Sequence, residues 1–124
     1  MAKNILIVED NVHLREVLAK IIQHHGYEIS EASSGSQAIE TAKSVKPHLI
    51  LLDLDLPDMT GMEAARAIRR NSKTAHIPIV ACSASMGEEF KEAATRAGAI
   101  DYLLKPISAD VIKSTIDRFV LFEH

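Results

Sequence analysis

The fold of this chain is decided by the stretch Leu49-Ile50-Leu51-Leu52-Asp53-Leu54-Asp55-Leu56-Pro57. Its four leading apolar residues fit a strand that is buried on both faces, as strands of parallel sheets are. The strand then reaches the carboxylate of Asp53 at its C-terminal end, the edge where open α/β sheets place their ligand crevice. A carboxylate in this position is costly without a partner, a metal or a chemical role. We therefore expect Asp53 to be the active group that the rest of the chain serves.

The composition is that of a single domain. The chain has 124 residues and a formal net charge of −3, with acids and bases interspersed, so we expect neither nucleic acid nor a membrane surface as a partner. Its one cysteine cannot form an internal disulfide, and no segment approaches the roughly 18 apolar residues of a membrane span. The N-terminus lacks the layout of a signal peptide. We predict one cytoplasmic domain over residues 1–124, with no effector domain after it.

Strands and helices alternate along the sequence. Short apolar runs predict strands at 5–8, 28–32, 49–52, 79–82 and 101–104. Helical periodicity predicts helices at 12–25, 37–45, 62–70 and 87–97, and a last helix capped by Ser108. The first helix has one apolar face, made of Leu14, Val17, Leu18, Ile21 and Ile22. Five strands alternating with five helices predict an α/β fold with a doubly wound parallel sheet.

Polar residues follow four of these strands: Glu9 and Asp10, Asp53, Ser83, and Lys105. Right-handed crossovers bring all the strand ends to one edge of the sheet, so these side chains should converge. Crowded acids need a cation, and oxygen ligands suit Mg²⁺. Each residue alone has an ordinary structural explanation, such as a helix cap, a turn or a solvated surface. Together they supply a nucleophile, a metal site, a cation and a hydroxyl, so we predict phosphoryl transfer to Asp53.

The chain resembles the response-regulator receiver domain of two-component signalling over essentially its whole length. The matching stretches are Ile5-Leu6-Ile7-Val8-Glu9-Asp10, Asp53-Leu54-Asp55-Leu56-Pro57-Asp58-Met59-Thr60-Gly61, Ala81-Cys82-Ser83-Ala84 and Gly98-Ala99-Ile100-Asp101-Tyr102-Leu103-Leu104-Lys105-Pro106. The resemblance implies a flavodoxin-like, five-stranded sheet of order 2-1-3-4-5 with five helices. It also implies a phosphohistidine donor, on a sensor histidine kinase or a histidine phosphotransfer protein, and no enzymatic activity beyond the domain's own phosphorylation and dephosphorylation.

The same resemblance implies a metal site. Glu9, Asp10 and Asp53 would hold Mg²⁺ (or Mn²⁺), with the backbone carbonyl of Asp55 as a further ligand.

The resemblance further implies a switch. Lys105 would pair with the phosphoryl oxygens, and Ser83 and the Ala84 amide would hydrogen-bond them. Tyr102 would swing inward as Ser83 moves, and this would alter the face formed by the fourth helix, fifth strand and fifth helix for a downstream protein target or a homodimer. The Lys105–Pro106 bond is commonly cis in the family.

Three positions depart from the usual family pattern. Glu9 replaces a more frequent aspartate and keeps its charge, and Ser83 replaces a frequent threonine and keeps its hydroxyl. Asp55 stands where the family usually has a neutral residue. This extra acid would either tighten Mg²⁺ binding or repel the phosphoryl group, so we hypothesise that it alters the lifetime of the phosphorylated state.

Two alternative functions fit parts of the sequence. A haloacid-dehalogenase-type phosphatase also uses an aspartyl nucleophile, and Asp53-Leu54-Asp55 fits its motif, but Pro57 occupies a Thr or Val position and a cap segment is missing. A receiver-like docking module without phosphorylation usually lacks one of the acids, the hydroxyl or the lysine, all of which are present.

The end of the chain leaves two settings open, a stand-alone receiver or a domain of a hybrid kinase or longer regulator. Leu121 and Phe122 extend the apolar side of the last helix and mark either a partner face or packing on the domain itself.

Overall fold

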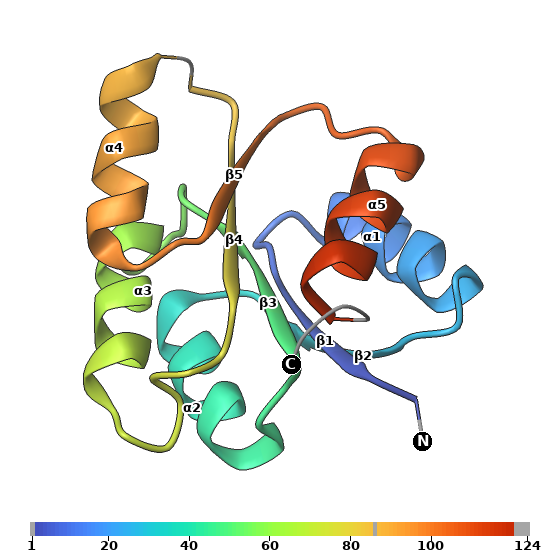
Figure 1. Ribbon diagram of the computed structural model, residues 1–124, viewed down its shortest axis with the longest axis horizontal. Coiled ribbons are helices and arrows are strands. Elements are labelled where there is room, and N and C mark those ends of the chain that lie inside the picture. Colours follow the sequence, from blue (N-terminus) through green and yellow to red (C-terminus); the bar gives the residue numbers. More distant parts are fainter. Residues whose placement is uncertain (1, 86, 121–124) are drawn as a thin grey trace.

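Five strands alternate with five helices in the computed structural model, which describes residues 2–85 and 87–120 (Figure 1). In chain order they are β1 (Asn4–Val8), α1 (Val12–His24), β2 (Glu28–Ala32), α2 (Gly35–Val45), β3 (Leu49–Asp53), α3 (Gly61–Arg70), β4 (Ile79–Ser83), α4 (Glu88–Ala97), β5 (Asp101–Leu104) and α5 (Ala109–Val120).

The strands form one parallel sheet of order β2-β1-β3-β4-β5, which confirms the predicted fold class and strand order. Helices α1 and α5 cover one face of the sheet, and α2, α3 and α4 cover the other (Figure 1). Every residue of β3 and β4 is buried, whereas the edge strands β2 and β5 are partly exposed. Residues 49–52 are all apolar because helices pack on both faces of this strand.

Some element boundaries differ from those predicted. Helix α2 begins at Gly35, two residues before Gln37, because the hydroxyl of Ser34 accepts a hydrogen bond from the Gln37 N–H at 3.2 Å. Asp58, in the loop after β3, also accepts the Gly35 N–H at 2.8 Å. A few other boundaries differ by one residue: β1 begins at Asn4, α1 ends at His24, β3 ends at Asp53, α3 begins at Gly61 and α4 begins at Glu88.

The predicted apolar face of α1 is partly wrong. Leu18 and Ile22 are buried as expected, but Val17 lies at the rim of the face and is 39% exposed. Leu121 and Phe122 lie outside the described residues, so their predicted role stays a prediction. No helix within the described ranges is long and apolar enough to cross a membrane.

A glycine lets α3 start directly against the end of β3. A Cβ atom on Gly61 would lie 2.4 Å from the backbone oxygen of Asp53 and 2.5 Å from the Cα of Leu54. Thr60 precedes it as the N-cap and exchanges hydrogen bonds with Glu63 in a capping box. This close approach fixes the backbone from which the Asp53 side chain projects.

Arg69 ties the C-terminal ends of α3 and α4 together. Its guanidinium donates to the carbonyl of Gly98, which follows α4, at 2.7 and 3.1 Å. It also donates to the carbonyls of Ala75 and Ile77, in the segment before β4, at 3.0 and 2.6 Å. The last turn of α4 is thus held by a side chain of the neighbouring helix.

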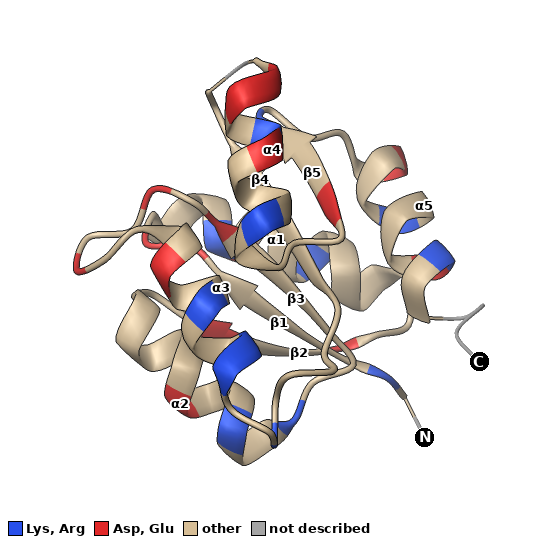
Figure 2. Cartoon of the chain, turned by 60° about the vertical axis from the view of Figure 1, so that its left-hand side comes forward, with Lys and Arg blue, Asp and Glu red and all other residues tan. Residues whose placement is uncertain are grey.

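The helices carry charges that complement their dipoles. Basic residues occupy the last turn of α3, and acidic residues occupy the first turn of α4 (Figure 2). Negative charge at a helix N-terminus and positive charge at a C-terminus are favourable. These surface charges therefore have a structural explanation.

We expect Gly61→Ala to lower the free energy of unfolding by about 1–3 kcal/mol, because the added methyl group overlaps backbone atoms that cannot move independently. Urea unfolding followed by circular dichroism measures the change. Arg66→Ala, on the exposed side of the same helix, is the control and should change it by less than about 0.5 kcal/mol. A Gly61 variant as stable as this control would contradict the packing argument.

Candidate phosphoacceptor site

The predicted polar residues do meet at one edge of the sheet. Glu9 and Asp10 follow β1, Asp53 ends β3, Ser83 ends β4 and Lys105 follows β5. Asp53 and Glu9 are each only 3% exposed, which is rare for carboxylates unless they are paired. The parallel topology produces this convergence because all five strands end at the same edge.

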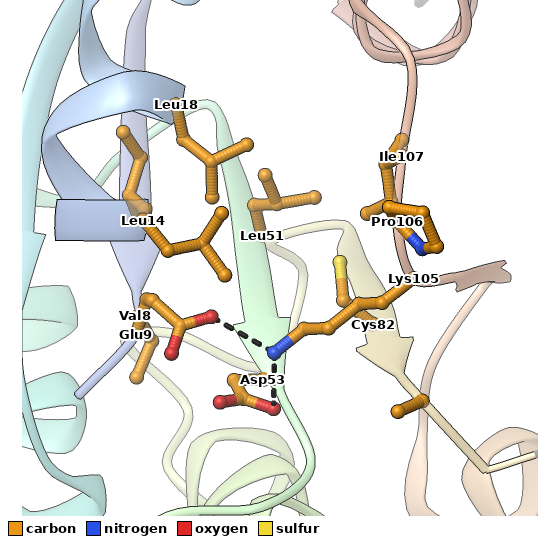
Figure 3. Close-up of a pocket in the computed structure, with 12 residues that line it drawn as sticks. Val8, Glu9, Leu14, Leu18, Leu51, Asp53, Cys82, Lys105, Pro106 and Ile107 are labelled. Carbon is orange, nitrogen blue, oxygen red and sulfur yellow. Dashed lines mark hydrogen bonds and ion pairs between the residues drawn. The ribbon is translucent and has the colours of Figure 1, made fainter. Parts of the chain in front are cut away.

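Lys105 holds the two buried carboxylates together. Its Nζ lies 2.9 Å from Oε1 of Glu9 and 3.2 Å from Oδ1 of Asp53 (Figure 3). These charge-assisted contacts compensate for the loss of hydration of all three groups. One ammonium group therefore neutralises one of two negative charges.

Asp10 completes a cluster of three acids. Carboxylate oxygens of Glu9, Asp10 and Asp53 all lie within 4.8 Å of one another, and Asp10 is exposed to solvent. Hard oxygen donors beside open water suit Mg²⁺, which keeps several of its waters when a protein binds it. The chemistry and spacing of these donors therefore fit a divalent cation.

Burial raises the pKa of Asp53 to about 6. The N–H of Asp55, which donates to Oδ1 of Asp53 at 3.0 Å, opposes this rise, as does the positive charge of Lys105, whereas the charge of Glu9 adds to it. Burial alone would lower the pKa of Lys105, but the hydrogen bond to Glu9 and the charges of both acids outweigh it, so the pKa of Lys105 is raised. At neutral pH Lys105 is therefore protonated, and Asp53 is mainly a carboxylate.

The Ser83 hydroxyl is engaged with its own loop and not with the acids. Its buried hydroxyl accepts a hydrogen bond from the Ser85 N–H at 3.0 Å, and among the described residues it has no hydrogen bond to Asp53 or Lys105. Tyr102 packs against the core between the sheet and α2–α4, and its hydroxyl donates to the carbonyl of Ser85 at 2.6 Å. Ser85 thus links the two residues predicted to switch, a role that nothing in the sequence indicated.

Asp55 and Ala84, two further residues predicted for the site, lie beside it but contribute little to it through their side chains. The backbone N–H of Asp55 binds Asp53, but its exposed carboxylate is not among the three clustered acids. Ala84 is exposed and lines the same cavity as Asp53 and Lys105. The Lys105–Pro106 bond is cis, as the resemblance implied.

A cavity of about 380 Å³ opens beside the acids, on the side of the sheet that α1 and α5 cover (Figure 3). Leu14 and Leu18 of α1 form one wall, and Ile107, after β5, lies opposite. Sequence analysis did not predict this cavity, because apolar residues on a helix face indicate packing and not where packing is incomplete.

Comparison with known proteins identifies the family. The family described as "Response regulator receiver domain" matches residues 5–117. The chain belongs to this family. This receiver domain is 41% identical over 108 residues to the phosphate regulon transcriptional regulatory protein PhoB of Pseudomonas aeruginosa, and the match covers 87% of the chain but 47% of PhoB. It is 32% identical over 120 residues to the polar-differentiation response regulator DivK of Brucella ovis, a match that covers 97% of the chain and 98% of DivK.

A solved relative supports the metal assignment. The receiver domain of the sensor histidine kinase PA1611 from Pseudomonas aeruginosa is 30% identical, with a TM-score of 0.89, and the match covers 97% of this chain and 98% of that one. That structure has a magnesium ion coordinated in its active site cleft. Receiver domains bind Mg²⁺ in an acidic pocket, and the cluster of Glu9, Asp10 and Asp53 forms such a pocket here.

We expect Lys105→Met to raise the pKa of Asp53 above 6, because the positive charge that favours its carboxylate is lost. Carbon-detected NMR of the Asp53 carboxyl group between pH 4 and pH 8 follows the titration directly. In the wild type, acidification should protonate Asp53 near pH 6, well before Asp58, whose hydrogen bonds to Ser36 and Gly35 lower its pKa to about 2.

Lys91→Met, on the exposed surface of α4, is the control and should leave the Asp53 titration unchanged. If both variants titrate alike, Lys105 does not control the charge of Asp53.

Proposed function

We propose that this receiver domain is the phosphoacceptor of a two-component or phosphorelay system, and that Asp53 takes the phosphoryl group from a phosphohistidine donor. The observation that supports this most directly is the buried Asp53 carboxylate, with Lys105 at 3.2 Å and two further acids beside it. A structural ion pair needs one acid for its lysine. Three clustered acids around one lysine leave net negative charge for a metal ion to offset.

The transfer requires a carboxylate nucleophile in line with the donor. An Oδ atom of Asp53 forms a bond to phosphorus as the bond between phosphorus and the donor imidazole nitrogen breaks, and the electron pair of that bond stays on the imidazole. Lys105 then faces the phosphoryl oxygens instead of the free carboxylate. Glu9, Asp10, Asp53 and the carbonyl of Asp55 would hold Mg²⁺ (or Mn²⁺), which when bound neutralises phosphoryl charge.

The output step begins at Ser83. A phosphoryl group on Asp53 offers strong acceptors to the Ser83 O–H and the Ala84 N–H. A turn of the Ser83 side chain toward that group would take its oxygen away from the Ser85 N–H, whose hydrogen bond it now accepts. Because the Tyr102 hydroxyl holds the carbonyl of the same Ser85, a shift of this loop alters the position of Tyr102 on β5. The new charge is thereby passed to the surface of α4, β5 and α5.

That surface has apolar residues available for docking. Phe90 on α4, Leu104 on β5 and Val111 on α5 are 44%, 43% and 42% exposed. We propose that a downstream protein or a second receiver binds there, and that the domain catalyses nothing beyond its own phosphorylation and dephosphorylation. Family membership argues against the phosphatase alternative, whose motif already fails at Pro57.

The test is the intact mass after incubation with acetyl phosphate and Mg²⁺. We expect a single phosphoryl adduct that requires Mg²⁺ and is absent from Asp53→Asn. Asp58→Asn, in the loop after β3 but outside the acid cluster, is the control and should still be phosphorylated.

No adduct on the wild type, together with no binding of the phosphoryl analogue beryllofluoride, would favour the phosphorylation-independent docking module. An adduct that persists in Asp53→Asn would move the acceptor to another residue.

We expect Asp55→Asn to slow the loss of the phosphoryl group about two- to fivefold, because it removes a like charge near the phosphorylated aspartate. The effect is small because an exposed charge contributes only about 0.4–1 kcal/mol. Phosphoprotein decay followed by intact mass gives both rates. Equal rates in the wild type and the variant would rule out a role for Asp55 in the lifetime.

A further inference from the structure

The cavity beside Asp53 is larger than a phosphoryl group requires. Its volume of about 380 Å³ lies within the range of small-molecule pockets, which is roughly 300–1,000 Å³. It extends from the acids to buried side chains, with Leu51 and Cys82 of the sheet as its floor. A phosphoryl group would occupy only the polar end.

The walls of the cavity are apolar and come from separate parts of the chain. Leu14 and Leu18 project from α1 and Pro106 and Ile107 from the loop after β5, and Figure 3 shows them around the space above Lys105. Such a lining favours one ring or a short alkyl chain, through burial of apolar surface.

The polar end of the cavity carries a net negative charge. Glu9 and Asp53 carry two negative charges, and Lys105 supplies one positive charge between them. Asp10 adds another negative charge close by, while Arg15, which donates to the Glu9 carbonyl, is balanced by Glu31 at 3.2 Å. The residual charge is negative, so a cation is attracted and an anion is repelled.

From this geometry we infer a binding site for a small amphipathic cation, a molecule with one apolar ring or short chain and one amine. The apolar part lies between α1 and the loop after β5, on Leu51 and Cys82. The amine lies at the carboxylates of Glu9 and Asp53, where it competes with a divalent cation for the same charge. The site belongs to the unphosphorylated domain and does not require Asp53 to be a phosphoacceptor.

Three probes of nearly equal size test the inference: 2-phenylethylamine, the neutral 2-phenylethanol and the anionic phenylacetate. Titration of the ¹⁵N-labelled chain without Mg²⁺, followed by amide chemical shifts, should place the amine between α1 and the loop after β5, with a Kd of about 1 mM. The amine should bind at least about tenfold more tightly than phenylacetate, because the charge interaction changes sign. Saturating Mg²⁺ should weaken the binding of 2-phenylethylamine severalfold, because both cations need the same carboxylates.

Variants separate the two parts of the site. Cys82→Met extends a side chain into the cavity and should abolish binding, whereas Cys82→Ala, its matched control, should bind the amine as the wild type does. Leu18→Phe fills the cavity from the opposite wall. It serves as the cavity-filling variant if Cys82→Met does not fold. Glu9→Gln should keep the cavity but reduce the preference for the amine over phenylacetate.

The inference is overturned if the amine causes no shifts at these residues. It is also overturned if the amine binds both filled variants as tightly as the wild type, or if phenylacetate binds as tightly as the amine.

Discussion

Two buried acids that share one lysine are the constraint on which this structure depends. Glu9 and Asp53 lie at the C-terminal ends of the neighbouring strands β1 and β3, and Lys105 follows β5 at the edge of the sheet, so its side chain must pass over β4 to reach them. The residue of β4 in register with Asp53 is Cys82, which is small enough to leave room for that path. Burial of the acids, the length of the lysine and the size of Cys82 are therefore linked.

The order of the strands makes this arrangement possible. The acids must be adjacent to form one cluster, which β1 and β3 achieve as direct neighbours at the centre of the sheet. A central position also excludes water from both faces of β3, and this loss of hydration is the main cause of the raised pKa of Asp53. Weak solvation leaves the Asp53 carboxylate dependent on Lys105 for the compensation of its charge.

Much of the fold and most of the site could be predicted from sequence, because both rest on local patterns. Apolar runs and helical periods located every element, and the polar residues at four of the five strand ends located Asp53, Lys105 and the clustered acids. The errors arose where tertiary contacts determine a helix boundary or the burial of a side chain. Asp58 accepts a hydrogen bond at the start of α2, and Val17 lies at the rim of its helix face. The link through Ser85 was not predictable, because a backbone carbonyl has no signature in sequence.

The two ends of α4 are held very differently. At its C-terminal end, the Gly98 carbonyl accepts two hydrogen bonds from Arg69, while at its N-terminal end Gly87 provides no side-chain cap. In the proposed switch, a helix fastened at one end would pivot about that end, so a small displacement near Ser85 would become a rotation of α4 and not a translation. Such a rotation would move Phe90, in the first turn, further than any residue of the last turn. The Arg69 contact would set the centre of that rotation at the C-terminal end of the helix.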